Sequence, residues 1–192
     1  MSRSAAAIFF AATVLIALAA AAVLWRRGQP SQGPKTAAEA TEVEDEPAAR
    51  TAAALLYFPG RGGKLYPEER EVPVGEGVEC RIATLVKELL NGPTQASLYP
   101  PLPPEVTLGS VYVTSEAVAY VDLDAPPELA RPAWGSKQEI LAVYSLVDTV
   151  LLNFPEVEAV VLLWNGQQRA TFAGHLDTTR PLGPSRKLLA GR

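Results

Sequence analysis

The amino-acid sequence predicts an α+β fold of two layers, in which two helices pack on a mainly antiparallel sheet, after an N-terminal transmembrane helix. Three observations support this prediction. Six short segments rich in β-branched and aromatic residues surround two helical patterns, in the order ββαββαββ. Each helical pattern keeps apolar residues on one face, as a helix that covers a sheet requires. An apolar run of 21 residues precedes all of these elements.

The apolar run, residues 5–25, contains no charge, proline or glycine. At about 1.5 Å per residue, it can cross the roughly 30 Å hydrocarbon core of a lipid bilayer as a helix. A cleaved signal peptide is the alternative, because Ala20–Ala22 resembles a small-residue cleavage site. However, Trp25 and two arginines follow closely, and these residue types suit the lipid–water interface. We therefore expect residues 1–27 to be an uncleaved membrane anchor.

Residues 28–50 lack apolar periodicity, contain several prolines and glycines, and carry an acidic cluster at Glu42–Glu46. This composition is typical of a disordered spacer. We expect the folded domain to span residues 51–181, followed by a C-terminal tail over residues 182–192. The length beyond the anchor suffices for one domain with its own core.

The charge balance and the cysteine content narrow the function. From Thr51 onward the sequence has 12 Lys and Arg against 16 Asp and Glu. An acidic domain without a basic stripe is not expected to bind nucleic acid, which requires neutralisation of phosphates. Cys80 is the single cysteine, so the chain has no internal disulfide and no cysteine-based zinc site. We expect neither a metal nor a cofactor.

The first half of the domain is expected to contain a hairpin, a helix and a connector. Ala54–Phe58 and Lys64–Val74 are the strands, and the glycines between them suit a turn because glycine tolerates positive φ. Apolar residues at i, i+3, i+4, i+7 and i+8 from Ile82 predict a helix that ends at Asn91-Gly92-Pro93. The proline-rich stretch Tyr99–Pro104 resembles a PxxP ligand, but in a small domain it is more often a stiff connector.

The second half is expected to contain four strands and one helix. The helix opens at Ser136, where Glu139 three positions later completes a capping box, and it ends before Pro155. Asn165-Gly166 is typical of a two-residue hairpin turn. The expected strands are Val106–Val113, Ala117–Leu123, Ala159–Trp164 and Gln167–Phe172.

Several segments, taken in their order and spacing, resemble the GerMN domain, a module named for spore-germination proteins and found in bacterial envelope proteins. The resemblance covers residues 53–181, as a single copy. The segments that carry it are Leu89-Leu90-Asn91-Gly92-Pro93, Leu102-Pro103, Val121-Asp122-Leu123, Tyr144–Leu151, Val157–Val161, Trp164-Asn165-Gly166 and Thr171–Asp177.

The resemblance implies a fold similar to the ring-building modules of secretion and sporulation machines. It also implies a domain on the extracytoplasmic side of the cytoplasmic membrane, because members of this family are usually secreted, lipid-anchored or membrane-anchored. The family has no established catalytic residues, so the resemblance transfers none to this chain.

A histidine and a group of acidic residues are considered as catalytic or binding residues. His175 is the only histidine and has no Gly-x-Ser-x-Gly nucleophile motif to serve, so we expect it to form a hydrogen bond in the loop after a strand. Asp122 and Asp124, with Glu128 nearby, resemble carboxylates that flank a glycosidic bond or hold Ca²⁺. Turn hydrogen bonding explains Asp122 better, because it directly follows a strand core. No catalytic residue is assigned.

Trp134 lies in a proline-rich loop and is a candidate for stacking on a sugar or contacting a protein, whereas Trp164, at the end of an apolar strand, suits the edge of the core. Ser145, Asp148 and Thr149 lie beside the apolar face of the second helix, where such residues line a groove, mark the boundary between core and solvent, or form local hydrogen bonds to the backbone. The candidate binding residues are Trp134, Asp122 and His175.

These observations favour a non-catalytic, single-pass membrane protein of the cell envelope. The expected partners are the lipid bilayer, through residues 5–25, and an envelope protein or peptidoglycan, reached through a sheet edge or the loop around Trp134. Self-association is also open. The alternative is a cell-wall hydrolase or its accessory subunit that uses Asp122 or His175. A carrier of a small ligand is a third hypothesis, and a role in sporulation or germination follows from the resemblance alone.

Overall fold

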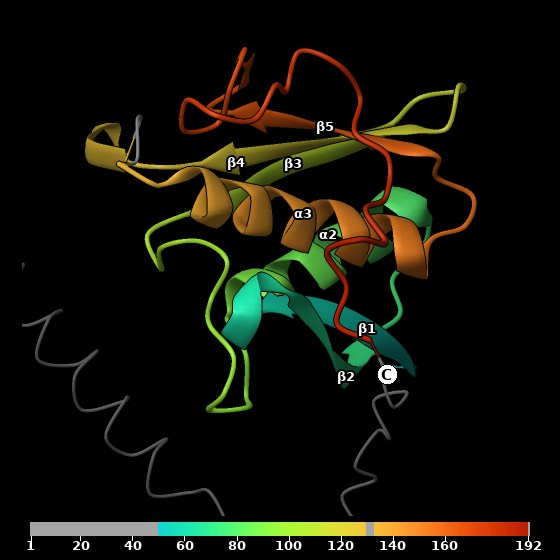
Figure 1. The fold of residues 1–192 in the computed structure, drawn as a ribbon. Coiled ribbons are helices and arrows are strands. Elements are labelled where there is room, and N and C mark those ends of the chain that lie inside the picture. The colour runs from blue at the N-terminus through green and yellow to red at the C-terminus, as the bar shows by residue number, and fades with distance from the viewer. Residues whose placement is uncertain (1–49, 130–132, 192) are drawn as a thin grey trace, which may run out of the picture. The chain divides into compact units, whose positions relative to one another are not determined.

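The computed structural model describes residues 50–129 and 133–191 (Figure 1). The predicted order ββαββαββ is confirmed, with two short 3-10 helices, η1 (Arg61–Gly63) and η2 (Pro127–Leu129), in the connections. The other elements are β1 (Thr51–Pro59), β2 (Leu65–Pro73), α2 (Val78–Leu90), β3 (Thr107–Val113), β4 (Val118–Asp124), α3 (Ser136–Asn153), β5 (Ala159–Trp164) and β6 (Gln167–Gln168).

The predicted anchor, residues 1–27, and the predicted spacer up to residue 49 lie outside the described residues. Among the residues that the structure does describe, no helix has the length and apolar character needed to cross a bilayer.

The strands form two sheets, so the prediction of one sheet in a two-layer fold is wrong. β1 and β2 make an antiparallel hairpin, and the second sheet has the order β3-β4-β5-β6. Figure 1 shows α2 and α3 between the two sheets. The physical reason lies in α3, in which 11 of 18 residues are buried. A helix that is buried nearly all round requires a layer on each side.

The four-stranded sheet is mixed. β3 pairs with β4 antiparallel, β4 pairs with β5 parallel, and β5 pairs with β6 antiparallel. Parallel strands need a crossover, and α3 supplies it between β4 and β5. The turn to β6 has positive φ at both Asn165 and Gly166, as the sequence predicts for a primed turn. β6 is shorter than expected because Thr178 binds the carbonyl oxygens of Arg169 and Ala170.

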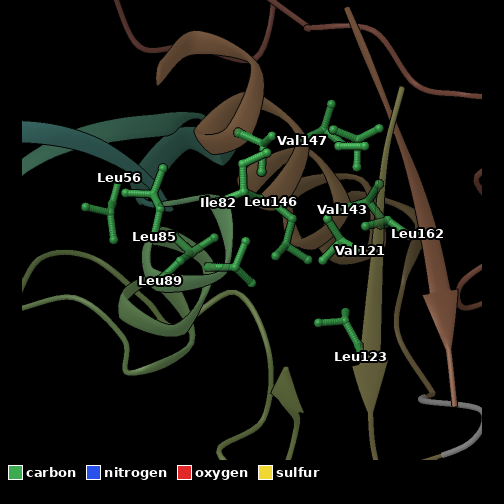
Figure 2. Close-up of a cluster of buried hydrophobic side chains, with 14 of the residues drawn as sticks. Leu56, Ile82, Leu85, Leu89, Val121, Leu123, Val143, Leu146, Val147 and Leu162 are labelled. Carbon is green, nitrogen blue, oxygen red and sulfur yellow. The ribbon is translucent and has the colours of Figure 1, made fainter. Parts of the chain in front are cut away.

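The core lies where the two helices meet both sheets (Figure 2). α2 ends at Leu90, as its pattern predicts, and faces inward with Ile82, Leu85 and Leu89. The proline-rich stretch is a connector, because Leu102 is buried in the same cluster. The buried residues labelled in Figure 2 are Leu56, Ile82, Leu85, Leu89, Val121, Leu123, Val143, Leu146, Val147 and Leu162.

One edge of β1 is satisfied by side chains of α3 instead of by a strand. Asn153 exchanges two hydrogen bonds with the backbone of Leu55, at 3.0 Å and 2.7 Å. The backbone N–H of Tyr57 donates to the hydroxyl of Thr149 at 2.9 Å, and the hydroxyl of Ser145 donates to the carbonyl oxygen of Tyr57. Buried backbone groups need such partners, so these side chains replace a neighbouring strand.

Replacing Thr149 by valine tests this substitution of side chains for a strand. Thr149→Val keeps the shape but leaves the buried N–H of Tyr57 without an acceptor, so we expect a loss of about 1–3 kcal/mol in the free energy of unfolding. Urea unfolding of the full chain in detergent, followed by tryptophan fluorescence, measures it. Thr107→Val, at an exposed position in β3, is the control and should change stability by less than about 0.5 kcal/mol. Equal stability of the two variants would contradict the proposed role of the hydroxyl.

Candidate functional site

Two of the three candidate residues, Trp134 and His175, lie near one loop, residues 165–178, which we call the C-terminal loop. The loop follows β5 and surrounds a concavity of about 580 Å³ lined by Gln167, Arg169 and the segment 170–174. A bridge between Thr171 and Asp177 closes the loop on itself. In Figure 1 this loop lies beyond β5, on the side of the four-stranded sheet away from the hairpin.

The C-terminal loop is held by a buried carboxylate on α3. Glu139 is fully buried and accepts hydrogen bonds from the backbone N–H of Ala173 at 2.6 Å and of His175 at 2.7 Å. Its Oε2 also lies 3.0 Å from Nδ1 of His175, whose side chain is 44% exposed. Burial raises the pKa of Glu139, but the hydrogen bonds from Ala173, Leu176 and His175 outweigh it and hold the pKa below its ordinary value.

The predicted capping box is therefore wrong. Gly135 is the N-cap of α3, and no side chain caps this end. Glu139 does not bind the backbone of its own helix. Three backbone N–H groups of the C-terminal loop stabilise its buried charge instead. His175 forms the loop hydrogen bond that its sequence context suggests.

Three aromatic rings lie together beside the C-terminal loop. Phe172 packs edge-on against Trp164 with a centroid distance of 4.7 Å, and lies 5.7 Å from the ring of Trp134. The guanidinium of Arg169 lies 5.3 Å above the ring of Trp164. Trp164 is buried, and Trp134 is half-buried. Trp134 thus presents part of its ring beside Phe172 and not as a free platform.

Asp122 has a structural role at a different turn. Its Oδ1 accepts a hydrogen bond from the backbone N–H of Gly166 at 2.9 Å. Asn165 reinforces the same contact by exchanging hydrogen bonds with the backbone of Ala125. In the described part of the chain, Asp122 and His175 share no hydrogen-bond partner. Within residues 50–129 and 133–191, no three His, Cys, Asp or Glu side chains lie close enough to hold a metal ion.

Sequence reasoning missed a second loop-holding carboxylate, Glu68. This residue of β2 accepts hydrogen bonds from the backbone N–H groups of Thr94 and Gln95. Its Oε1 also forms a salt bridge with Nη2 of Arg70 at 2.6 Å. Burial raises the pKa of Glu68, but these donors hold the pKa below its ordinary value. Its pattern gave no signal, because Glu68 lies in an acidic run, Glu68-Glu69-Arg70-Glu71, that is typical of a solvent-exposed segment.

Asp148 is a third buried carboxylate, on α3. One oxygen accepts a hydrogen bond from the backbone N–H of Ser185 at 2.7 Å, and the other has no hydrogen-bond partner among the described residues. Burial raises the pKa of Asp148 to about 6, and the hydrogen bond from Ser185 opposes the rise only in part. Asp148 therefore holds the C-terminal segment against α3 through Ser185, but its own negative charge has few hydrogen-bond donors.

The outer edge of β3 has no partner strand within the described part of the chain. The outer edge of β1 is filled by α3, Leu65 of β2 pairs with residues 188–190, and β5 is covered by β6 and Leu182. No hydrogen bond from another described segment reaches the outer edge of β3. The strand, Thr107–Val113, has no charged residue, and the side chain of Tyr112 is 62% exposed opposite Tyr120. Tyr112 was not a sequence candidate, because nothing in the pattern distinguishes an edge strand from a central one.

The pKa of Asp148 predicts a pH dependence of stability. Folding raises the pKa of Asp148 from 3.8 to about 6. The contribution of Asp148 to the free energy of unfolding is therefore fully present below pH 3.8 and is lost as the pH rises through 6. The difference between the two pKa values corresponds to about 3 kcal/mol. Between pH 4 and pH 7, the wild type should lose stability relative to Asp148→Asn, which keeps the acceptor for Ser185 without the charge. Urea unfolding at several pH values measures this, and parallel pH profiles for the two proteins would refute it.

Comparisons with known proteins identify the family. A search of curated proteins found no match. Among solved structures, the first GerMN domain of the Bacillus subtilis sporulation protein GerM aligns with a TM-score of 0.53 at 20% identity, over 71% of this chain and 99% of that one. The tandem GerMN domains of the same protein align with a TM-score of 0.53 at 18% identity, over 70% of this chain and 46% of that one.

A Clostridium perfringens protein, provisionally described as a lipoprotein, aligns with a TM-score of 0.50 at 24% identity, over 69% of this chain and 87% of that one. At these identities the structural matches support the fold alone. The family model named Germane, described as sporulation and spore germination, matches residues 55–170, which is more than half of the sequence. The chain therefore belongs to the Germane family, and its folded part is a GerMN-type domain.

Proposed function

We propose that this protein is a non-catalytic binding module of the bacterial cell envelope, anchored in the cytoplasmic membrane by residues 5–25 with its GerMN-type domain on the extracytoplasmic side. Family membership supports a role related to sporulation or germination. The 23 residues of the segment 28–50 can span up to about 80 Å when extended, so the domain can reach partners well above the lipid surface.

The observation that carries this proposal is the open edge of β3. Unpaired backbone N–H and C=O groups along an edge strand bind an extended segment of a partner by adding a strand to the sheet. Natural proteins protect unused edges with charges and prolines, and the outward positions of β2 include Pro67, Glu69, Glu71 and Pro73. β3 has neither residue type and presents Tyr112 beside the edge, although a bulge near Gly109 interrupts its pairing with β4. The favoured partner is therefore an envelope protein.

The hydrogen bonds of two carboxylates favour binding over catalysis. Glu139 and Asp122 each accept hydrogen bonds from backbone N–H groups of the same domain. A general acid or base must instead reach the substrate and exchange a proton with it. The side chains between the helices and the sheets form one cluster of buried apolar residues (Figure 2), which argues against a carrier of a small ligand in that space.

A charge placed at the open edge tests the proposed partner surface. Tyr112→Lys adds a charge beside β3, whereas Tyr99→Lys makes the same change at another exposed tyrosine, 52% accessible, and serves as the control. In affinity capture from envelope membranes with the full chain as bait, we expect partners retained by the wild type and by Tyr99→Lys to fall about tenfold with Tyr112→Lys. Trp134→Ala tests the other candidate surface. Equal capture by the wild type and Tyr112→Lys would contradict the role of β3.

The alternative, a cell-wall hydrolase or its accessory subunit, predicts the release of soluble fragments from purified peptidoglycan. We expect the full chain in detergent to release no more than buffer does, as measured by chromatography of the soluble fraction. Asp122→Asn and His175→Ala are the matched variants. Release by the wild type that disappears in either variant would establish catalysis and overturn the proposal of a binding module.

A further inference from the structure

Five exposed cations gather at the turn of the hairpin. Arg61 and Lys64 belong to the connection between β1 and β2, Lys137 to the first turn of α3, and Arg186 and Lys187 to the C-terminal segment. We call these five residues the basic patch. They come from three parts of the sequence, which is why no basic stripe is visible in it.

Direct contacts bring the three segments together. Nζ of Lys64 donates a hydrogen bond to the carbonyl oxygen of Lys187 at 2.6 Å. The side chain of Lys137 lies against Gly63, where an added Cβ would stand 2.3 Å from Nζ of Lys137. The backbone of Leu65 exchanges hydrogen bonds with Leu188 and Ala190, both at 2.8 Å, which holds the C-terminal segment beside the turn.

The charges of the basic patch are not neutralised within the described part of the chain. The ion pairs found there involve Arg70, Arg81 and His175, and none involves a member of the patch. The two carboxylates on the adjacent α3, Glu139 and Asp148, are buried and directed to backbone N–H groups. Positive charge is therefore concentrated around the hairpin turn, although the net charge of the whole chain is −4.

We propose that the basic patch rests on anionic phospholipid headgroups and orients the domain on the membrane. Lysine ammonium groups on long side chains, contributed by three segments, suit an array of headgroups more than one shaped ligand. A cluster of five Lys and Arg residues has the charge complementarity that binds anionic lipid headgroups. The sequence outside the structure contains the apolar run that we propose as the anchor.

The length of the chain permits this orientation. The basic patch lies at the opposite end of the hairpin from Thr51, where β1 begins, and nine residues of extended strand span about 27 Å. The segment 28–50 spans up to about 80 Å, so it can pass from the membrane to Thr51 while the patch touches the lipid. β3 belongs to the sheet on the other side of the helices, so its open edge stays free (Figure 1).

Lysine footprinting of the full chain tests the proposal. The protein is reconstituted into vesicles of phosphatidylcholine alone or with about 30% phosphatidylglycerol, treated briefly with an acetylating reagent at about 0.1 M salt, and analysed by mass spectrometry. We expect acetylation of Lys64, Lys137 and Lys187 to be at least about threefold lower in the anionic vesicles and to recover at about 0.5 M salt. Lys87, exposed on α2, should react equally in both and serves as the internal control.

A pair of charge-matched variants provides the second measurement. Lys64→Gln/Lys187→Gln removes two charges from the basic patch, and Arg50→Gln/Lys87→Gln removes two exposed charges elsewhere. The protection of Lys137 should disappear in the first variant and persist in the second. Equal reactivity of the patch lysines in neutral and anionic vesicles, or equal protection of Lys137 in both variants, would overturn the proposal.

Two further arms separate lipid binding from binding of a soluble polyanion and from a failure of the anchor. Polyphosphate added to the neutral vesicles should give no protection, and protection equal to that in anionic vesicles would assign the patch to a soluble polyanion instead. Retention of the chain in neutral vesicles after a carbonate wash reports on the anchor separately. If the chain is not retained, the same footprint with vesicles added from outside still decides whether the patch binds lipid.

Discussion

The fold depends on the burial of α3 between two sheets. A helix in this position needs hydrogen-bond partners for its own polar side chains, and the backbone at the edge of β1 needs partners as well. One row of side chains on α3 meets both needs. Ser145, Thr149 and Asn153 are spaced by four, which is a rise of about 6 Å. Leu55 and Tyr57 are spaced by two, which is about 6.7 Å along a strand. The near match of these two repeats lets a helix replace a β-strand as the neighbour of β1.

Buried carboxylates extend the same principle to the loops. Glu68 holds residues 94–95, Glu139 holds residues 173–175, and Asp148 holds Ser185. Each carboxylate accepts backbone N–H groups that would otherwise lack a partner, so a loop without regular structure acquires a fixed position. Glu68 and Glu139 have several donors and a lowered pKa, whereas Asp148 has one and a raised pKa. The number of hydrogen-bond donors therefore decides whether the ionised carboxylate is stabilised in the core.

The two surfaces proposed for external partners lie apart from these internal contacts. Asp122 and Glu139 bind the domain's own backbone, whereas the uncharged edge of β3 and the cations around the hairpin turn are exposed to solvent. The two surfaces belong to different layers of the fold, the four-stranded sheet and the hairpin with the adjoining end of α3. A domain arranged in this way can meet a charged layer on one side and an extended protein segment on the other.

Local patterns in the sequence determined the helices, the order of helices and strands along the chain, and the Asn165-Gly166 turn, because these depend on side-chain periodicity and on the φ values that a residue tolerates. They also indicated hydrogen-bonding roles for Asp122 and His175. Only the tertiary structure decided that the strands form two sheets, that Glu139 binds the C-terminal loop instead of capping its helix, and that cations from three segments lie around the hairpin turn. Each of these outcomes is a contact between residues far apart in the chain, for which local periodicity contains no information.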